Sequence, residues 1–156
     1  MSAATMTQRK CRLFLVDAFT QERFCGNPAA VVLDADVLEE QEMRRIAREL
    51  AGFEVAFVLG SDSPDFDVEL RFFSPRREVG FVGHATVAAH YVRAMADGVP
   101  RGKVRQKSAA GIVGVEECDP IRLRAQHRHV ARGVAAGPRL RPAQDLQPLV
   151  ALAHDF

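Results

Sequence analysis

The sequence has few cysteines, and they fit neither a disulfide framework nor a metal site. Cys11, Cys25 and Cys118 lie far apart, and any disulfide would leave one thiol unpaired. No CxxC pair and no Cys/His cluster has the ligand spacing of a zinc site. We therefore expect a protein of a reducing compartment, the cytoplasm, with no metal.

Long apolar runs and an excess of charge are also missing. The first ten residues, MSAATMTQRK, lack the apolar core of a signal peptide, and no stretch reaches the roughly 18 apolar residues of a membrane span. The net charge of +1 gives neither a basic field for nucleic acid nor the acidic excess typical of disorder. With 47% hydrophobic residues, the chain is expected to be globular and to bind neither membrane nor nucleic acid.

Several widespread catalytic motifs are absent as well. The chain contains no GxGxxG, no P-loop, no GxSxG and no HExxH sequence. Any chemistry must therefore be sought in single residues and their surroundings.

The pattern of apolar residues predicts an α+β fold. Alternation and turn residues predict strands over 11–19, 29–33, 53–59 and 66–73, and a hairpin over 104–115. A helix with one apolar face is predicted over 38–50. The segment 84–96 is apolar on almost all sides, which is typical of a buried helix. The simplest packing places this helix inside a strongly curved, mostly antiparallel sheet.

Composition divides the chain into three parts. Residues 1–10 are polar and are expected to be disordered, and residues 11–118 hold the regular pattern of a domain. Residues 119–156 are rich in arginine, proline and alanine and show no sustained periodicity, which predicts an atypical tail. The arginines of this tail are interpreted as solvated, with binding of an anionic partner as the alternative.

Glu54 is the first candidate for chemistry because it is a lone carboxylate in the apolar run FEVAFV. If the side chain is buried, desolvation raises the pKa of its carboxyl group toward neutrality, as a general acid/base requires. The alternative is a glutamate at the exposed end of a strand.

Gly83 and His84 are the second candidate because they precede the apolar helix. The first turn of a helix presents unpaired N–H donors and a positive dipole end, and a glycine there permits close approach of an anion. His84 could exchange a proton beside that anion, or it could simply cap the helix. His90, inside the helix, is interpreted as structural.

Asp17 and Asn27 are the third candidates. Asp17 follows the first predicted strand, and Asn27 belongs to the turn Gly26-Asn27-Pro28. Either side chain could bind a polar ligand, and either could stabilise a turn.

Four segments stand in a distinctive order and spacing: VDAFT (16–20) with FCGNPAAVVL (24–33), IARELAGFEVAFVL (46–59), RFFSPRREV (71–79) and GHATVAAHYVRA (83–94). Taken together, these segments resemble the N-terminal domain of the PhzF family of phenazine biosynthesis. The resemblance covers about residues 11–115, and the order and spacing of the segments carry it.

The resemblance implies a fold similar to diaminopimelate epimerase, in which two domains each wrap a curved sheet around a central helix. It also implies an isomerase that moves a proton on a small carboxylate-bearing metabolite in a biosynthetic process, without cofactor or metal. Carried over by position, the catalytic residues are Glu54 and His84, and Gly83 helps to bind the substrate carboxylate. In phenazine biosynthesis the substrate is a dihydro-hydroxyanthranilate.

The sequence departs from the family pattern in three ways. Phe53 and Val55 flank Glu54 where many relatives have Ser and Thr, and Val82 stands where relatives often have the cysteine of a two-thiol racemase. The chain is also about half as long as family members, and the segment after Asp119 does not resemble them. Because a lone domain exposes the surface that its partner covers, we expect a homodimer.

Two further functions compete with the isomerase. The chain could be a binding or interaction protein that keeps the scaffold without turnover, or a fragment of marginal stability. The discriminating observations are ligand binding without turnover for the first and a broad, non-cooperative melt for the second.

Overall fold

A single mixed sheet curves around one helix in the computed structural model, which describes residues 9–20, 24–98, 102–117 and 151–154. The sheet order is β7-β6-β4-β3-β2-β1-β8, with β5 paired to β4. The elements are β1 (Arg12–Ala18), β2 (Asn27–Leu33), the 3-10 turn η1 (Ala35–Val37), α1 (Glu40–Glu49), β3 (Glu54–Leu59), β4 (Val68–Phe73), β5 (Glu78–Val79), α2 (Gly83–Asp97), β6 (Gly102–Ser108), β7 (Gly111–Glu117) and β8 (Ala151–His154).

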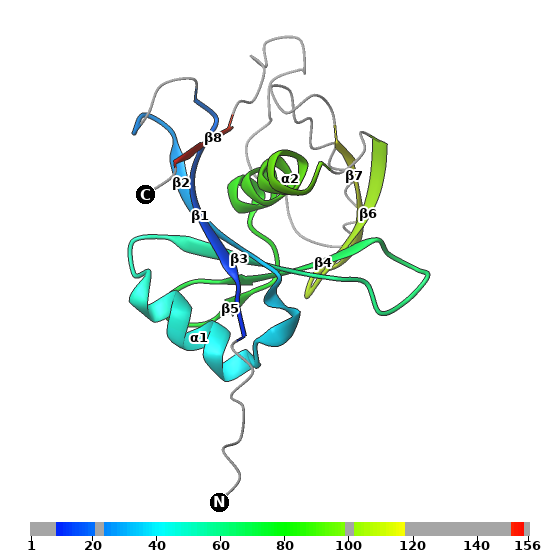
Figure 1. The fold of residues 1–156 in the computed structure, drawn as a ribbon, viewed down its shortest axis with the longest axis horizontal. Helices are drawn as coiled ribbons and strands as arrows, with labels where there is room; N and C mark the ends of the chain where they lie inside the picture. Colours follow the sequence, from blue (N-terminus) through cyan, green and yellow to red (C-terminus); the bar gives the residue numbers. More distant parts are fainter. Residues whose placement is uncertain (1–8, 21–23, 99–101, 118–150, 155–156) are drawn as a thin grey trace, which may run out of the picture.

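The sheet is mostly antiparallel, with two parallel contacts. β2 runs parallel to β3, and β4 runs parallel to β6, while the other paired strands are antiparallel. Figure 1 shows α2 between the β1–β2–β8 side of the sheet and the β6–β7 side. The predicted α+β fold with a central helix inside a curved sheet is therefore confirmed.

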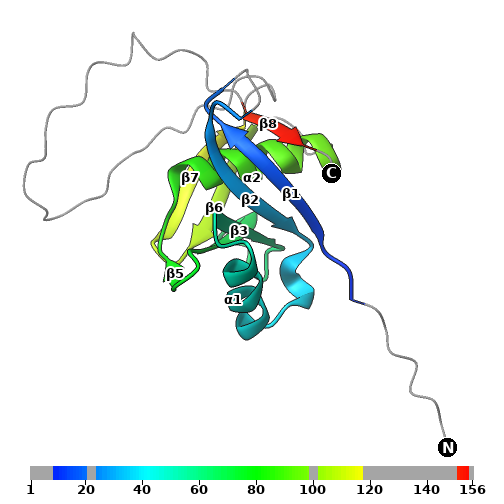
Figure 2. The ribbon, with the colours of Figure 1, turned by 90° about the vertical axis from the view of Figure 1, so that its left-hand side faces the viewer.

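The two helices lie on opposite sides of the sheet, as Figures 1 and 2 both show. Because side chains alternate along a strand, β3 contributes to two cores. Ala56 and Val58 pack on the α2 side, and Val55 and Phe57 pack on the α1 side. The face on which a strand residue lies therefore decides which helix it meets.

The central position of α2 follows from its small apolar side chains. Its buried residues occupy almost every side of the helix, as the sequence predicted: Ala85, Thr86, Val87, Ala88, Ala89, His90 and Val92. Alanines and valines let the curved sheet approach the helix closely. The helix ends at Gly98, whose φ of 61° is the left-handed conformation that favours glycine.

The predicted boundaries of the three parts stay predictions. Residues 1–8 of the predicted N-terminal segment and residues 119–150, 155 and 156 of the predicted tail lie outside the described residues. The short strand β8 does come from the tail region, and it pairs antiparallel with β1, Ala151 opposite Ala18. Among the described residues, no helix is long and apolar enough to cross a membrane.

Candidate active site

Glu54 and His84 meet at one end of the sheet. Glu54 is the first residue of β3, and His84 is the second residue of α2. The Nε2 atom of His84 lies 3.2 Å from Oε2 of Glu54, and the two side chains are 13% and 40% exposed, respectively. The structure therefore brings together a carboxylate and an imidazole that are far apart in sequence, at hydrogen-bonding distance and within reach of solvent.

The register of the sheet explains this meeting. Glu54 is paired with Ala29 of the parallel strand β2, and Ala29 and Ala56 belong to the core on the α2 side. Glu54 shares that face because side chains two positions apart on a strand point the same way. The carboxylate is thus directed toward the first turn of α2, where His84 lies.

Asn27 reaches the same end of the sheet. It is the exposed first residue of β2 and lies two positions before Ala29, so it shares the α2-side face with Glu54. No hydrogen bond links its side chain to another described residue. Register thus groups Asn27, Glu54 and His84 on one face at one end of the sheet.

The start of α2 adds backbone donors to this group. The residue before the helix, Val82, provides no side-chain cap, although its carbonyl oxygen accepts the N–H (2.9 Å) and the hydroxyl (2.8 Å) of Thr86. The first N–H groups of a helix have no partner within it. A methyl group at Gly83 would meet nothing within 4 Å, so the space in front of this turn is open.

Glu54 is not buried. Although its neighbours Val55 and Ala56 are fully buried, the side chain of Glu54 is 40% exposed because it begins the strand at the end of the sheet. The alternative interpretation, a glutamate at an exposed strand end, describes its position, with His84 as an added neighbour.

Asp17 does not join this group. It lies on β1 opposite Pro28. Asp17 is two positions after Leu15 and therefore shares its face, and the side chain of Leu15 packs on the α1 side of the sheet. The carboxylate is buried, with 6% exposure, and its Oδ2 accepts the N–H of Phe24 at 2.7 Å. Asp17 thus holds the connection between β1 and β2, which is the turn role that the sequence left open.

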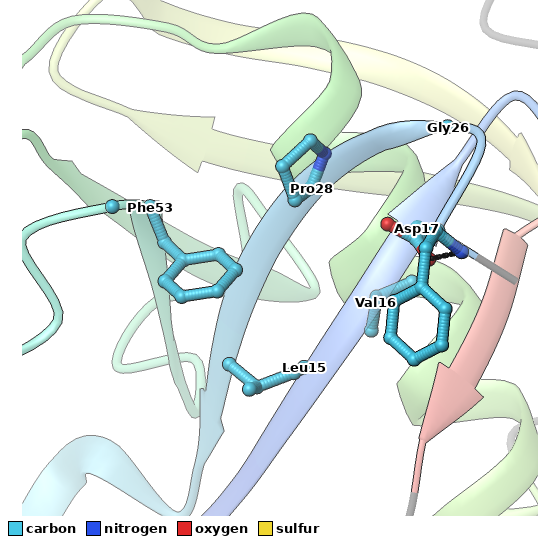
Figure 3. A pocket seen from close by; sticks show the side chains of 8 residues that line it. Leu15, Val16, Asp17, Gly26, Pro28 and Phe53 are labelled. Atoms are coloured by element: carbon cyan, nitrogen blue, oxygen red, sulfur yellow. Dashed lines mark hydrogen bonds between the residues drawn. The ribbon is translucent and has the colours of Figure 1, made fainter.

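Asp17 lines a cavity that the sequence did not indicate. Its volume is about 300 Å³, and Figure 3 shows Leu15, Asp17, Pro28 and Phe53 around it. These residues come from β1, from β2 and from the residue before β3, so no local motif announces the cavity. It lies across the sheet from Glu54.

His90 is a structural residue, as the sequence suggested. It is fully buried, its Nε2 lies 2.8 Å from Oε1 of Gln106, and its Nδ1 lies 3.1 Å from Nη1 of Arg93. Because an amide oxygen only accepts and a guanidinium only donates, Nε2 of His90 carries the proton and Nδ1 accepts. No cluster of three metal-binding side chains occurs among the described residues.

The fold matches that of solved PhzF-family and epimerase proteins. A PhzF-family phenazine biosynthesis protein from Bacillus anthracis is 38% identical and superposes with a TM-score of 0.61, over 69% of this chain and 36% of that one. A hydroxyproline epimerase from Agrobacterium vitis shares the fold with a TM-score of 0.52 at 12% identity, over 69% and 38% of the two chains. The fold is therefore that of the PhzF and epimerase class.

The sequence comparisons narrow this class to one family. The family model described as phenazine biosynthesis-like protein matches residues 16–136. An uncharacterized isomerase from Clostridium acetobutylicum is 46% identical over 108 residues, and the uncharacterized isomerase YddE of Escherichia coli is 52% identical over 102 residues. The chain belongs to the phenazine biosynthesis-like (PhzF) family, and it spans about a third of the length of these relatives, 36% and 34%.

Proposed function

We propose that this chain carries the proton-transfer half of an isomerase site for small carboxylate-bearing metabolites. The observation that carries the proposal is the 3.2 Å approach of His84 Nε2 to Glu54 Oε2 beside the uncapped start of α2. Two relatives bear the name uncharacterized isomerase, and these names support the proposal. The substrate class and the independence of a cofactor are part of the proposal.

In the proposed reaction Glu54 accepts a proton from a carbon of the substrate and returns a proton to another carbon. One C–H bond breaks and another forms, so that no oxidant or reductant is needed. His84, at hydrogen-bonding distance, orients the carboxylate and stabilises its charge. The substrate carboxylate accepts hydrogen bonds from the N–H groups at the start of α2, where the open space at Gly83 allows its approach.

The wider setting is proposed as well. The chain acts in the cytoplasm, in a biosynthetic process, and as a homodimer. The exposed aromatic side chain of Phe19, at 44% exposure after the end of β1, supports self-association. Asn27 is proposed to contact the substrate from the end of β2, whereas Asp17 holds the connecting loop.

A binding protein without turnover is the second candidate. The observation that favours it is the 40% exposure of Glu54, since a general acid/base usually works in a site from which water is excluded. In this case the start of α2 still binds carboxylates, but no proton is moved.

The test uses dihydro-hydroxyanthranilate in D₂O, because isomerisation through Glu54 places solvent deuterium on the product carbon. We expect Glu54→Gln to lower the rate by about 10²–10⁴, the usual contribution of a general acid/base. His84→Asn should lower it less, because Asn keeps a hydrogen-bond donor. Nuclear magnetic resonance follows both rate and deuterium content.

Glu49→Gln is the matched control, since Glu49 is an exposed residue at the far end of α1. Its rate should equal that of the unmodified chain. If Glu54→Gln keeps the full rate, the role of Glu54 is wrong. If the unmodified chain binds the compound but forms no isomer and exchanges no deuterium, the binding protein is the correct function.

A further inference from the structure

The cavity on the α1 side of the sheet is separate from the Glu54–His84 pair. Phe53 lines it, and Phe53 and Glu54 are adjacent in sequence, so their side chains leave the chain on opposite faces. The cavity has a volume of about 300 Å³, the lower end of the range of small-molecule sites. Its lining residues are Leu15, Val16, Asp17, Phe24, Gly26, Pro28, Gly52 and Phe53.

The walls of the cavity are mainly apolar and partly aromatic. Figure 3 shows the ring of Phe53 on one side, with Leu15 and Pro28 between it and Asp17. The ring of Phe24 lines the cavity and is 77% exposed, so a ligand would remove much of this apolar surface from water. A methyl group at Gly52 would meet nothing within 4 Å, which leaves that part of the rim open.

Asp17 gives the cavity its charge and holds Phe24 in place. Among the eight lining residues it is the one ionisable side chain, and it is 6% exposed. Its Oδ2 accepts the N–H of Phe24 at 2.7 Å, and Phe24 has a left-handed backbone with φ of 65°. Such a conformation is costly for a bulky residue, and strained residues of this kind cluster at ligand clamps.

The chemistry of a ligand follows from these walls. A carboxylate in a mostly apolar surrounding attracts a cation, and the faces of phenylalanine rings attract one as well. A carboxylate has about four lone-pair positions, so its charge acts on a ligand even while Oδ2 accepts the Phe24 N–H. Leu15 and Pro28 require that the rest of the ligand be apolar.

We propose that this cavity is a second binding site, which takes a small organic ammonium ion with an apolar body, such as an arylmethyl- or alkylammonium ion. The ammonium group lies toward Asp17, and the apolar body lies between Phe24 and Phe53. The site differs from the proposed isomerase site in charge preference, because the start of α2 favours anions.

The experiment titrates the full chain with benzylammonium and, separately, with benzyl alcohol, which has a similar shape and no charge. Chemical shifts of the Phe24 and Phe53 amides report binding. We expect benzylammonium to bind at least about tenfold more tightly than benzyl alcohol, in line with one charge-assisted contact. Phe24→Ala should weaken benzylammonium binding by about tenfold.

Phe19→Ala is the matched control, because Phe19 is a partly exposed phenylalanine of the same connection, with φ of 67°, and does not line the cavity. It should bind benzylammonium as the unmodified chain does. Glu54→Gln should also bind normally, which separates this site from the proposed isomerase site.

Equal binding of the alcohol, equal effects of the two phenylalanine variants, or no binding at all would overturn the proposal. Shifts that depend on protein concentration rather than on benzylammonium would assign the cavity to a second copy of the chain and also overturn it.

Discussion

Gly83 and His84, the first two residues of α2, differ in what they contribute to the candidate site. The histidine turns toward Glu54 at 3.2 Å, while the glycine leaves the space in front of the helix N–H groups open. Gly83 does not have a left-handed backbone, and no described residue would contact a methyl group placed there. The fold itself therefore does not require glycine at this position, and the proposed carboxylate site does.

Because the proposed carboxylate site requires glycine at position 83 and the fold does not, Gly83→Ala should affect binding and stability in opposite directions. Because alanine restricts the unfolded chain and suits a helix, we expect the free energy of unfolding to rise by about 0.4–1 kcal/mol. Because the methyl group occupies the space of the bound carboxylate, we expect weaker binding of benzoate. Urea unfolding measures the first effect, and a benzoate titration measures the second.

Gly26→Ala is the contrasting variant. A methyl group there would collide with the carbonyl oxygen of Ala18 and with Cγ2 of Thr20, so this variant should lose stability. If Gly83→Ala binds benzoate as tightly as the unmodified chain, the carboxylate does not lie against Gly83.

At the scale of elements, Arg71 links α1 to the sheet. From β4 its guanidinium contacts Glu78 of β5 at 2.7 Å and Glu40 at the start of α1 at 2.8 Å. It also lies over the ring of Phe73, 5.3 Å from the centroid. The hydrogen bonds from Arg71 and Arg44 lower the pKa of the Glu40 carboxyl group below its usual value of 4.5.

The sign of this shift predicts a pH dependence for Glu40→Gln. A carboxyl group whose pKa is lowered by folding stabilises the folded state above its unfolded pKa, and this contribution is lost as the pH falls through the folded value. The variant should therefore be slightly less stable than the unmodified chain at pH 7. The difference should disappear at a pH well below 4.5. Urea unfolding at both pH values measures it.

Glu49→Gln again serves as the control. Glu49 is exposed and forms no ion pair with any described residue, so its replacement should leave the pH dependence unchanged. A Glu40→Gln variant that differs from the unmodified chain equally at both pH values would show that Arg71 and Arg44 do not hold this carboxylate in solution.

At the scale of the whole molecule, the open face around Glu54 and the exposed ring of Phe19 predict self-association. We expect sedimentation velocity to show a homodimer at micromolar concentration, because a second copy would cover Phe19, which is 44% exposed. Phe19→Asp should shift the equilibrium toward the monomer. A clean monomer over a wide concentration range would contradict the prediction.

Much of the fold was predictable because its signals are local. The alternation of Val68, Leu70 and Phe72 indicated β4, and all three are buried. The apolar residues of 84–96 indicated a buried helix, and α2 occupies Gly83–Asp97. The parallel pairing of β2 with β3 had no such signal, because it joins strands on either side of α1 and depends on how that helix packs.

In the candidate site, too, some features were predictable from the sequence and others were not. Sequence identified Glu54, His84 and Gly83 as candidates, partly through the family resemblance, but it left open whether Glu54 is buried or stands at an exposed strand end. Its apolar neighbours are buried, yet its position at the end of β3 leaves it 40% exposed. Neighbouring residues predict the type of element, and only the position of a residue within the sheet decides its exposure.

By itself, the sequence determined the longer elements within residues 11–117, the central helix and the family, because apolar periodicity, turn residues and motif order are properties of short segments. The tertiary structure decided which side chains meet. Pairing of Ala29 with Glu54 directs the carboxylate toward His84, while the pleat of β1 turns Asp17 to the other face, beside Phe53. The reason is physical: side chains on a strand alternate between two faces, and only the packing of the helices decides what each face meets.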